Sequence, residues 1–448
     1  MFQLEKKGVP TTAVCFHYWD VCAACEKSAR NFGMENYPWV QVPIEHGIPY
    51  THDSMVKTVE EVVADGIIAA LTTTVPCVQN ETITEQILTL GGPETPTSEK
   101  IIFSGGDYPE ILDKFQQAFD DWGLSGGFIV VPPTEERIEK MLNGTSHFPD
   151  EVVTTTMDRT ELTVRKIATN AVMAGCKAVH LPVVLAVVRA EGQSRADNAL
   201  MFLDSPLVIV NGPIMEELQI ISGMPGPASG TAARANLAIS RAIRLIGMNM
   251  AGQWSGRMPV IVSEREADNP WEPYHVEMGY DENINTVTVL PISYSAPTSL
   301  YTGSVADQKP TCREVMFAIV HGMRGLENYP TYSALPSVLP LSDTVVMLGK
   351  EPARRIADDG WTKSDIKEYL WRETGIYAGD LKKAGSPMLQ YWSRFNKGVY
   401  DLDDEVLTPL VARAENFHIF VTDEGTGAYF WQGPFQGKLV TEVIDDWK

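Results

Sequence analysis

A completely apolar segment, Pro206 to Val210, ends at the polar turn Asn211-Gly212-Pro213, and this pattern limits the fold more strongly than any other. A short apolar run bounded by turn residues is typical of a buried strand, and Asn-Gly favours a sharp turn. α/β proteins often place ligand sites where such strands end. We therefore predict a buried strand whose end carries Asn211 and Gly212 as candidate binding residues.

Strand-like and helix-like patterns alternate along the 448 residues. Further strands are predicted at 259–262, 286–290 and 417–421, and helices at 109–122, 134–142, 160–174, 181–189, 232–250, 312–324, 363–372 and 403–415. This alternation favours an α/β protein with Rossmann-like layers and mostly parallel sheets. The chain is too long for one ordinary core, so two or three domains are expected. We place them at residues 1–124, 125–300 and 301–448.

The charge balance excludes some partners. Lys and Arg number 36 against 58 Asp and Glu, so the net charge is −22 and neither nucleic acid nor an anionic membrane surface is an expected partner. The first residues lack the apolar core of a signal peptide, and the apolar runs are too short to span a bilayer. These features predict a cytoplasmic protein, in which the six cysteines are expected to be free thiols.

Cys176 follows Gly175, which stands where a helix is expected to stop. A thiol beside the Lys177 ammonium, and near the start of the next helix, is expected to have a lowered pKa and to act as a nucleophile. Asn170 and His180 would then reach the same side. The alternative is a small buried cysteine that fills a contact between helices.

Carboxylates gather after the strand predicted at 259–262. Glu264 and Glu266 follow it, and a carboxylate against Trp271 would have a raised pKa suited to a general acid or base. Arg234 and Asn236 on a nearby helix are candidate ligands for a carboxylate or carbonyl group. The alternative for the charged run is a solvated loop.

Near the start of the chain, Cys22 and Cys25 form a Cys-x-x-Cys pair with histidines close in sequence. This spacing suits a metal site or a thioredoxin-like redox pair, although no second pair of ligands accompanies it. The alternative is two cysteines spaced along a packed helix.

Several of these motifs, taken in order, resemble one known pattern. They are Pro132-Pro133-Thr134-Glu135-Glu136, Asn170 to Cys176, Leu181-Pro182-Val183-Val184, Asn211-Gly212-Pro213-Ile214, Arg234-Ala235-Asn236 with Ser240-Arg241-Ala242, and Asn269-Pro270-Trp271-Glu272-Pro273. The series resembles the domain associated with the UGSC family of (seleno)proteins, which is similar to selenoprotein B of glycine and betaine reductases. The resemblance covers roughly residues 127 to 290 and implies thiol- or selenol-linked enzyme chemistry.

The chain departs from the family pattern in two places. Its start, Leu4 to Thr12, is similar to the part of the UGSC module that follows the Gly-Ser-Cys motif, but that motif is absent. The resemblance therefore implies a small partner subunit that carries the missing half-module and its thiol. Where family members have Pro-Glu-aromatic after the cysteine, this chain has Ala178-Val179-His180, which makes His180 the candidate acid or base.

Together these features predict an enzyme subunit that acts on a small polar molecule at a carbon–heteroatom bond by reductase- or lyase-like thiol chemistry. Cys176 or a partner's thiol would react with the substrate, and Glu264 or Glu266 would move protons. The residues expected to bind the substrate are Asn170, Asn211, Gly212, Arg234, Asn236 and Trp271. No cofactor is identified. A metal-dependent lyase or hydratase using Cys22 and Cys25 is one alternative, and a noncatalytic scaffold subunit is another.

Overall fold

The computed structural model describes residues 13–16, 39–42, 63–72, 101–156, 160–194, 205–223, 232–251, 258–292, 294–298, 311–324, 343–384, 401–423, 428–432 and 438–448. They belong to two compact units, residues 1–129 and 130–448. Cys22 and Cys25 lie outside the described residues. Within the described ranges, no helix is both long and apolar enough to cross a membrane.

The first unit pairs strand β1 (Ala13–Phe16) with β2 (Trp39–Val42) in parallel and also holds helices α4 (Ala64–Thr72) and α6 (Tyr108–Asp121). The helix predicted at 109–122 is thus confirmed as α6. It begins at Asp107, whose side chain accepts a hydrogen bond from the N–H of Glu110 at 2.9 Å and so caps the first turn. Its apolar face belongs to an aromatic cluster of Phe103, Phe115, Phe119 and Trp122.

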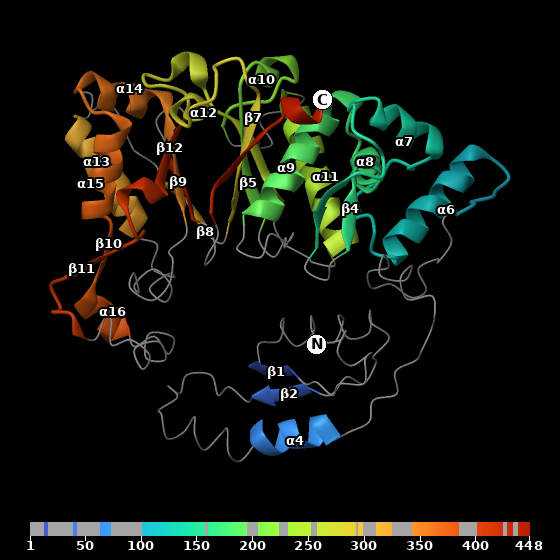
Figure 1. Ribbon diagram of the computed structural model, residues 1–448, viewed down its shortest axis with the longest axis horizontal. Coiled ribbons are helices and arrows are strands. Elements are labelled where there is room, and N and C mark those ends of the chain that lie inside the picture. The colour runs from blue at the N-terminus through green and yellow to red at the C-terminus, as the bar shows by residue number, and fades with distance from the viewer. Residues whose placement is uncertain are drawn as a thin grey trace. The chain divides into compact units, whose positions relative to one another are not determined.

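Two four-stranded mixed sheets form the centre of the second unit (Figure 1). The first has the order β14 (Val440–Val443), β7 (Thr286–Pro291), β5 (Pro206–Asn211) and β6 (Val260–Ser263). The second has the order β12 (Phe417–Thr422), β9 (Thr344–Gly349), β13 (Ala428–Gln432) and β8 (Tyr294–Thr298). Strands predicted at 206–210, 259–262, 286–290 and 417–421 are therefore confirmed.

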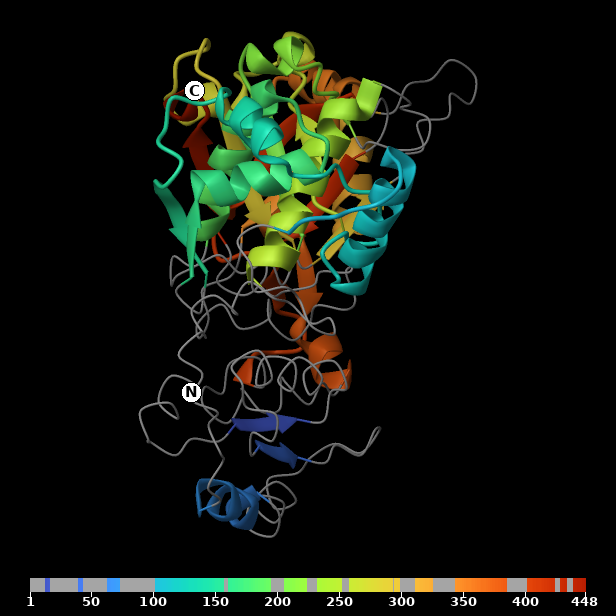
Figure 2. The same cartoon turned by 90° about the vertical axis from the view of Figure 1, so that its right-hand side faces the viewer.

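Helices cover the outer face of each sheet, so the second unit has four layers, helix–sheet–sheet–helix (Figures 1 and 2). On the first sheet lie α9 (Leu181–Gln193) and α11 (Arg234–Ala251), and α8 (Val164–Met173) packs against both of these helices. On the second lie α13 (Cys312–Arg324), α14 (Lys350–Asp358) and α15 (Lys363–Glu373). Helix α7 (Glu135–Leu142) packs on α8, and the hairpin of β3 (Val152–Thr155) and β4 (Glu161–Thr163) adjoins α9 and α8.

A shared core joins the two sheets. Leu207 and Ile209 of β5 face Val345 and Met347 of β9 and Phe420 of β12 in one cluster of buried side chains. The opposite face of the second sheet packs on α13, α14 and α15. Strands β5, β7 and β9 are thus buried on both faces, which explains why their sequences are almost continuously apolar. Residues 301–448, predicted as a separate domain, share this core with the central residues.

The prediction of an α/β fold is confirmed, but the prediction of mostly parallel sheets is wrong. Of the nine strand pairs among the described residues, six are antiparallel. Strands β7 and β13 run antiparallel to their neighbours β5 and β9. A continuously apolar strand indicates that both faces of the strand are buried. Here the second sheet covers one of those faces, so the neighbouring strands do not have to be parallel.

The helix predicted at 403–415 is also wrong. This segment contains the short strand β11 (Leu407–Pro409), which pairs antiparallel with β10 (Gly375–Tyr377), and a 3-10 turn at Ala414–Asn416. Pro409 lacks an N–H and its ring blocks a helix interior, which explains the difference.

Candidate functional site

The candidate site forms where two parallel strands of the first sheet end. Strands β5 and β6 are paired in parallel register, so Asn211 and the residues after Ser263 lie at the same sheet edge. The N–H of Glu264 continues the ladder to the Val210 carbonyl at 3.1 Å. The next N–H, that of Arg265, donates to Val421 of the second sheet at 2.7 Å. The segment after β6 therefore links the ends of both sheets.

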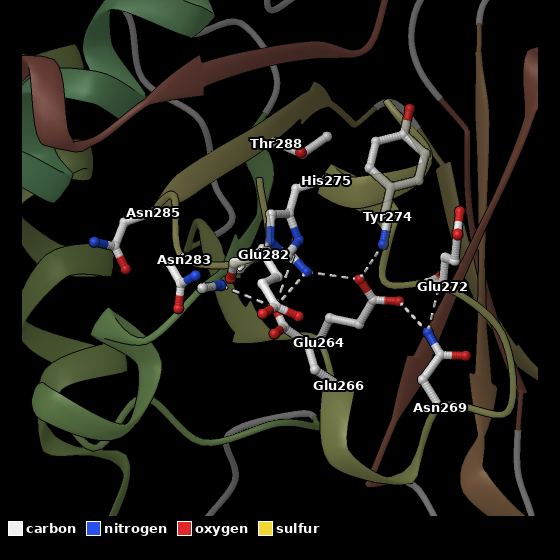
Figure 3. A network of polar contacts seen from close by, with 12 residues as sticks. Glu264, Glu266, Asn269, Glu272, Tyr274, His275, Glu282, Asn283, Asn285 and Thr288 are labelled. Atoms are coloured by element: carbon white, nitrogen blue, oxygen red, sulfur yellow. Dashed lines mark hydrogen bonds and ion pairs between the residues drawn. The ribbon is translucent and has the colours of Figure 1, made fainter. Parts of the chain in front are cut away.

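Glu264 is the centre of a polar network and is only 2% exposed. Its Oε2 accepts hydrogen bonds from Asn211 Nδ2 at 2.7 Å and from the N–H of Tyr274 at 2.8 Å. Its Oε1 accepts one from Asn269 Nδ2 at 2.9 Å and a longer one from the N–H of Val421 at 3.4 Å. Figure 3 shows Glu264 held between Tyr274 and Asn269. The donors surround both oxygens.

Burial raises the pKa of the Glu264 carboxyl above its ordinary value. The positive charge of Lys363 and the bonds from Tyr274 and Asn211 act in the opposite direction, while the negative charge of Glu266 adds to the rise. The raised pKa predicted for a carboxylate in this stretch is therefore found at Glu264. Its cause is burial at the junction of the sheets; the indole Nε1 of Trp271 instead donates to the Trp361 carbonyl at 2.8 Å.

Glu266 lies beside Glu264 in a 3-10 turn, η4 (Glu266–Asp268), and its side chain is 21% exposed. Its Oε1 accepts hydrogen bonds from Asn211 Nδ2 at 2.9 Å and from the N–H of Gly212 at 2.8 Å. Nδ1 of the fully buried His275 lies 3.7 Å from the same oxygen (Figure 3). All three of these contacts involve Oε1 of Glu266.

Asn211 therefore bridges two carboxylates through one amide nitrogen. Three buried polar atoms around it, Asn211 Oδ1, His275 Nδ1 and Thr286 Oγ1, have no hydrogen-bond partner within the part of the chain that the structure describes. Asn211 and Thr286 are direct partners in the β5–β7 register. Buried polar groups are nearly always satisfied, so such atoms mark a place where water or a polar ligand is expected to bind.

Gly212 fits this turn because its φ is +91°, in the left-handed region that favours glycine. The turn is also fixed from the other side. Oδ1 of Asn285 accepts the N–H of Ile214 at 2.7 Å, and Nδ2 of Asn285 donates to Oδ1 of Asp445 at 2.8 Å. The C-terminal residues thus help to hold the backbone that carries Asn211.

Sequence reasoning did not single out three residues of this site. Tyr274 and His275 begin α12 (Tyr274–Glu277), directly after a proline-rich turn, and a histidine in that place was a usable signal. Lys363 begins α15, nearly a hundred residues further on, and donates to the Glu272 carbonyl at 2.8 Å and to Glu277 Oε2 at 3.0 Å. No local pattern could have placed Lys363 here.

Cys176 lies elsewhere, at the end of α8. Gly175 has φ +81°, and the N–H groups of Gly175 and Cys176 donate to Val172 and Ala171, which confirms the predicted helix stop. The thiol donates to the Ala238 carbonyl of α11 at 3.3 Å. Burial raises its pKa to about 12, while the positive charge of Arg241 lowers it. The predicted lowering of the Cys176 pKa is therefore wrong: burial against α11 outweighs the nearby charges.

This environment predicts slow alkylation of Cys176. With a pKa of about 12, its thiolate population at pH 8 is about a thousandfold below that of a thiol with a pKa of 9. Iodoacetamide labelling followed by peptide mass mapping should show a correspondingly slower rate, still rising with pH above 9. Labelling of Cys176, a half-buried residue, as fast as a short cysteine peptide under the same conditions would contradict its raised pKa.

His180 and Arg234 lie near each other, and among the described residues neither forms a hydrogen bond to the Glu264 network. His180 is buried, its Nδ1 accepts the N–H of Lys177 at 3.2 Å, and burial together with the charges of Lys177 and Arg234 lowers its pKa to about 4. The His180 imidazole is therefore neutral near pH 7. A neutral ring is required for Nδ1 to accept the hydrogen bond from Lys177. Arg234 itself is exposed at the first turn of α11.

Two residues that were predicted to bind the substrate form hydrogen bonds within the protein instead. Asn170 donates to the Lys166 carbonyl at 3.0 Å and accepts from Asn249 at 2.8 Å, which joins α8 to α11. Asn236 is fully buried, accepts the N–H of Ile221 at 3.1 Å and donates to the carbonyl of Ile261 at 2.7 Å. Of the predicted site residues, Asn211, Gly212, Glu264 and Glu266 are brought together by direct hydrogen bonds.

Within the described ranges, no group of three or more His, Cys, Asp or Glu side chains is arranged to hold a metal ion. The Glu264, Glu266 and His275 side chains are instead engaged with N–H donors or with one another. The predicted metal ligands, Cys22 and Cys25, lie outside those ranges.

Comparisons of the chain with protein-family models, with curated proteins and with solved structures found no match. The resemblance to the UGSC family therefore stays a prediction.

Proposed function

We propose that this chain is an enzyme subunit that transfers protons to or from a small polar molecule at a carbon–heteroatom bond. The observation that carries the proposal is the pair of carboxylates, Glu264 and Glu266, bridged by Asn211 Nδ2 at 2.7 and 2.9 Å. Two neighbouring carboxylates in unequal surroundings, one buried with a raised pKa and the other partly exposed, are an arrangement that general acid–base catalysis uses.

The two carboxylates have different roles. Glu266 is the catalytic residue, because its side chain is 21% exposed, and we assign its Oε2 to the substrate because the hydrogen bonds from Asn211 and Gly212 go to Oε1. Glu264 and His275 are positioning residues, since both are almost completely buried. They hold Asn211 and Glu266 Oε1 in place, and Asn211, which is itself fully buried, is a positioning residue that donates from Nδ2 to Glu266 Oε1 at 2.9 Å.

A thiol step, if the reaction has one, comes from outside this site. Cys176 is hydrogen-bonded to Ala238, and its raised pKa makes it a poor nucleophile at neutral pH. We therefore assign the thiol that the UGSC resemblance implies to a partner subunit carrying the Gly-Ser-Cys half-module. In this proposal the present chain supplies substrate binding and proton transfer.

Solvent exchange tests proton transfer without requiring the complete reaction. The purified chain is incubated in D2O with a panel of small amino, hydroxy and keto acids, and deuterium entry at carbon is followed by NMR. We expect exchange for at least one substrate class, and Glu266→Gln should lower its rate by about a hundredfold or more, since general acid–base groups typically contribute that much.

Glu216→Gln is the matched control, because Glu216 is an exposed glutamate on the neighbouring α10 (Ile214–Glu217). It should leave exchange unchanged. Exchange that survives in Glu266→Gln would remove Glu266 from the mechanism. Exchange abolished by a metal chelator would favour the metal-dependent lyase or hydratase, whereas no exchange with any compound would favour a noncatalytic scaffold.

A further inference from the structure

A cavity of about 600 Å³ lies in the second unit between α9, β3 and the start of β14. Its lining is polar and comes from Thr154, Arg189, Gly192, Gln193, Lys438 and Thr441, with Leu439 and Val440. Its volume lies within the range of small-molecule sites. A net positive lining is unusual in a chain whose net charge is −22.

Both cations of the cavity are available to a ligand. Arg189 Nη1 donates to the Val153 carbonyl at 2.8 Å, and this bond fixes the guanidinium. The other N–H groups of the guanidinium can then donate to a ligand. Within the described part of the chain, neither Arg189 nor Lys438 forms an ion pair. The nearby Glu442 has a pKa raised by burial, which the hydrogen bond from Trp447 Nε1 at 3.3 Å and the positive charge of Arg189 partly offset.

The backbone shapes one wall of the cavity. A Cβ at Gly192 would come within 2.3 Å of Thr154 Oγ1, so glycine is what allows α9 and β3 to approach this closely. The approach places the Thr154 hydroxyl close to Gly192, and Gln193 and Lys438 line the same cavity. Hydroxyl and amide donors next to two cations are the groups that bind phosphate and carboxylate oxygens.

The cavity is separate from the Glu264 site. Val440 pairs with Val289, and Val289 pairs with Val208, three residues before Asn211 along β5. Three residues along a strand and two strand spacings across the sheet correspond to a separation of roughly 14 Å between Val440 and Asn211. Its lining residues are also different from those of the polar network.

We propose that this cavity binds the phosphate or carboxylate group of a small anionic molecule, held by Arg189 and Lys438 with Thr154, Gln193 and Thr441. The bound molecule is distinct from the substrate at Glu266. Because the chain as a whole repels anions, binding here requires a local arrangement of donors rather than general attraction.

Calorimetric titration of the full chain with inorganic phosphate and, separately, with succinate tests the proposal. We expect saturable binding of one or both anions and about tenfold weaker binding in Lys438→Gln, because a charge-assisted hydrogen bond is lost. Lys438→Glu should abolish binding. Lys140→Gln is the matched control, since it removes the same charge from an exposed position on α7.

Saturation by phosphate alone would identify a phosphoryl group as the recognised chemistry, and saturation by succinate alone a carboxylate. The proposal is overturned if neither anion binds saturably, or if Lys140→Gln weakens binding as much as Lys438→Gln. Circular dichroism of each variant shows that the fold is retained, so a loss of binding reports the cavity.

Discussion

Replacing Glu264 with alanine is expected to lower the free energy of unfolding by about 3 kcal/mol. The carboxylate accepts four N–H groups, from Asn211, Asn269, Tyr274 and Val421, at the junction of the two sheets. Alanine would leave these buried donors without an acceptor and would also leave a void. Urea unfolding followed by tryptophan fluorescence measures the loss as a lower midpoint.

Glu264→Gln is the conservative comparison and should cost about 1 to 2 kcal/mol. Its amide oxygen can replace Oε2 opposite Tyr274, but its NH2 then meets Asn269 Nδ2, which has to turn and give up its 3.0 Å bond from the Trp271 N–H. Glu216→Ala, on the exposed face of α10, should change stability by less than about 0.5 kcal/mol. A Glu264→Ala protein as stable as Glu216→Ala would show that the network contributes nothing.

Gly212→Ala is expected to lower the free energy of unfolding by about 3 to 4 kcal/mol, which combines the penalty of a left-handed conformation with a steric clash. At φ +91°, a Cβ would lie 2.5 Å from the Ile284 carbonyl oxygen and 2.9 Å from Asn285 Cα, both backbone atoms. The same backbone carries the N–H that donates to Glu266. Thermal and urea unfolding measure the loss.

Gly279 provides the control because its φ is +92° and a Cβ there would meet no atom within 4 Å. Gly279→Ala should therefore cost only the conformational penalty, about 1 kcal/mol. The difference between the two variants isolates the close approach of Gly212 to the loop before β7. Equal losses in both variants would show that this approach can relax without cost.

Local sequence patterns predicted several parts of the molecule correctly. The apolar run at 206–210, the turn at Asn211 and Gly212, and the helix stop at Gly175 all have the predicted structure. Each depends on neighbouring residues only: on burial of a short run, or on the freedom of glycine to adopt positive φ. The carboxylates Glu264 and Glu266 were recognised for the same reason, since they directly follow a strand.

Properties that depend on distant residues were not predictable in this way. The Cys176 pKa was expected to be lowered by Lys177, but α11, with Ala238 sixty-two residues away, buries the thiol. Lys363 joins the site from a segment whose own sequence gives no indication of it. Desolvation and long-range charge depend on what packs against a group, and no local pattern contains that information.

The sequence by itself determined where the strands lie, where they end and which polar residues stand at those ends, because hydrophobic periodicity and turn chemistry act over a few residues. Only the tertiary structure decided the strand directions, since a second sheet buries β5 and β9 without parallel neighbours on both sides. It also decided that Asn211 bridges Glu264 and Glu266, because that contact requires two strand ends, about fifty residues apart in sequence, to meet at one sheet edge.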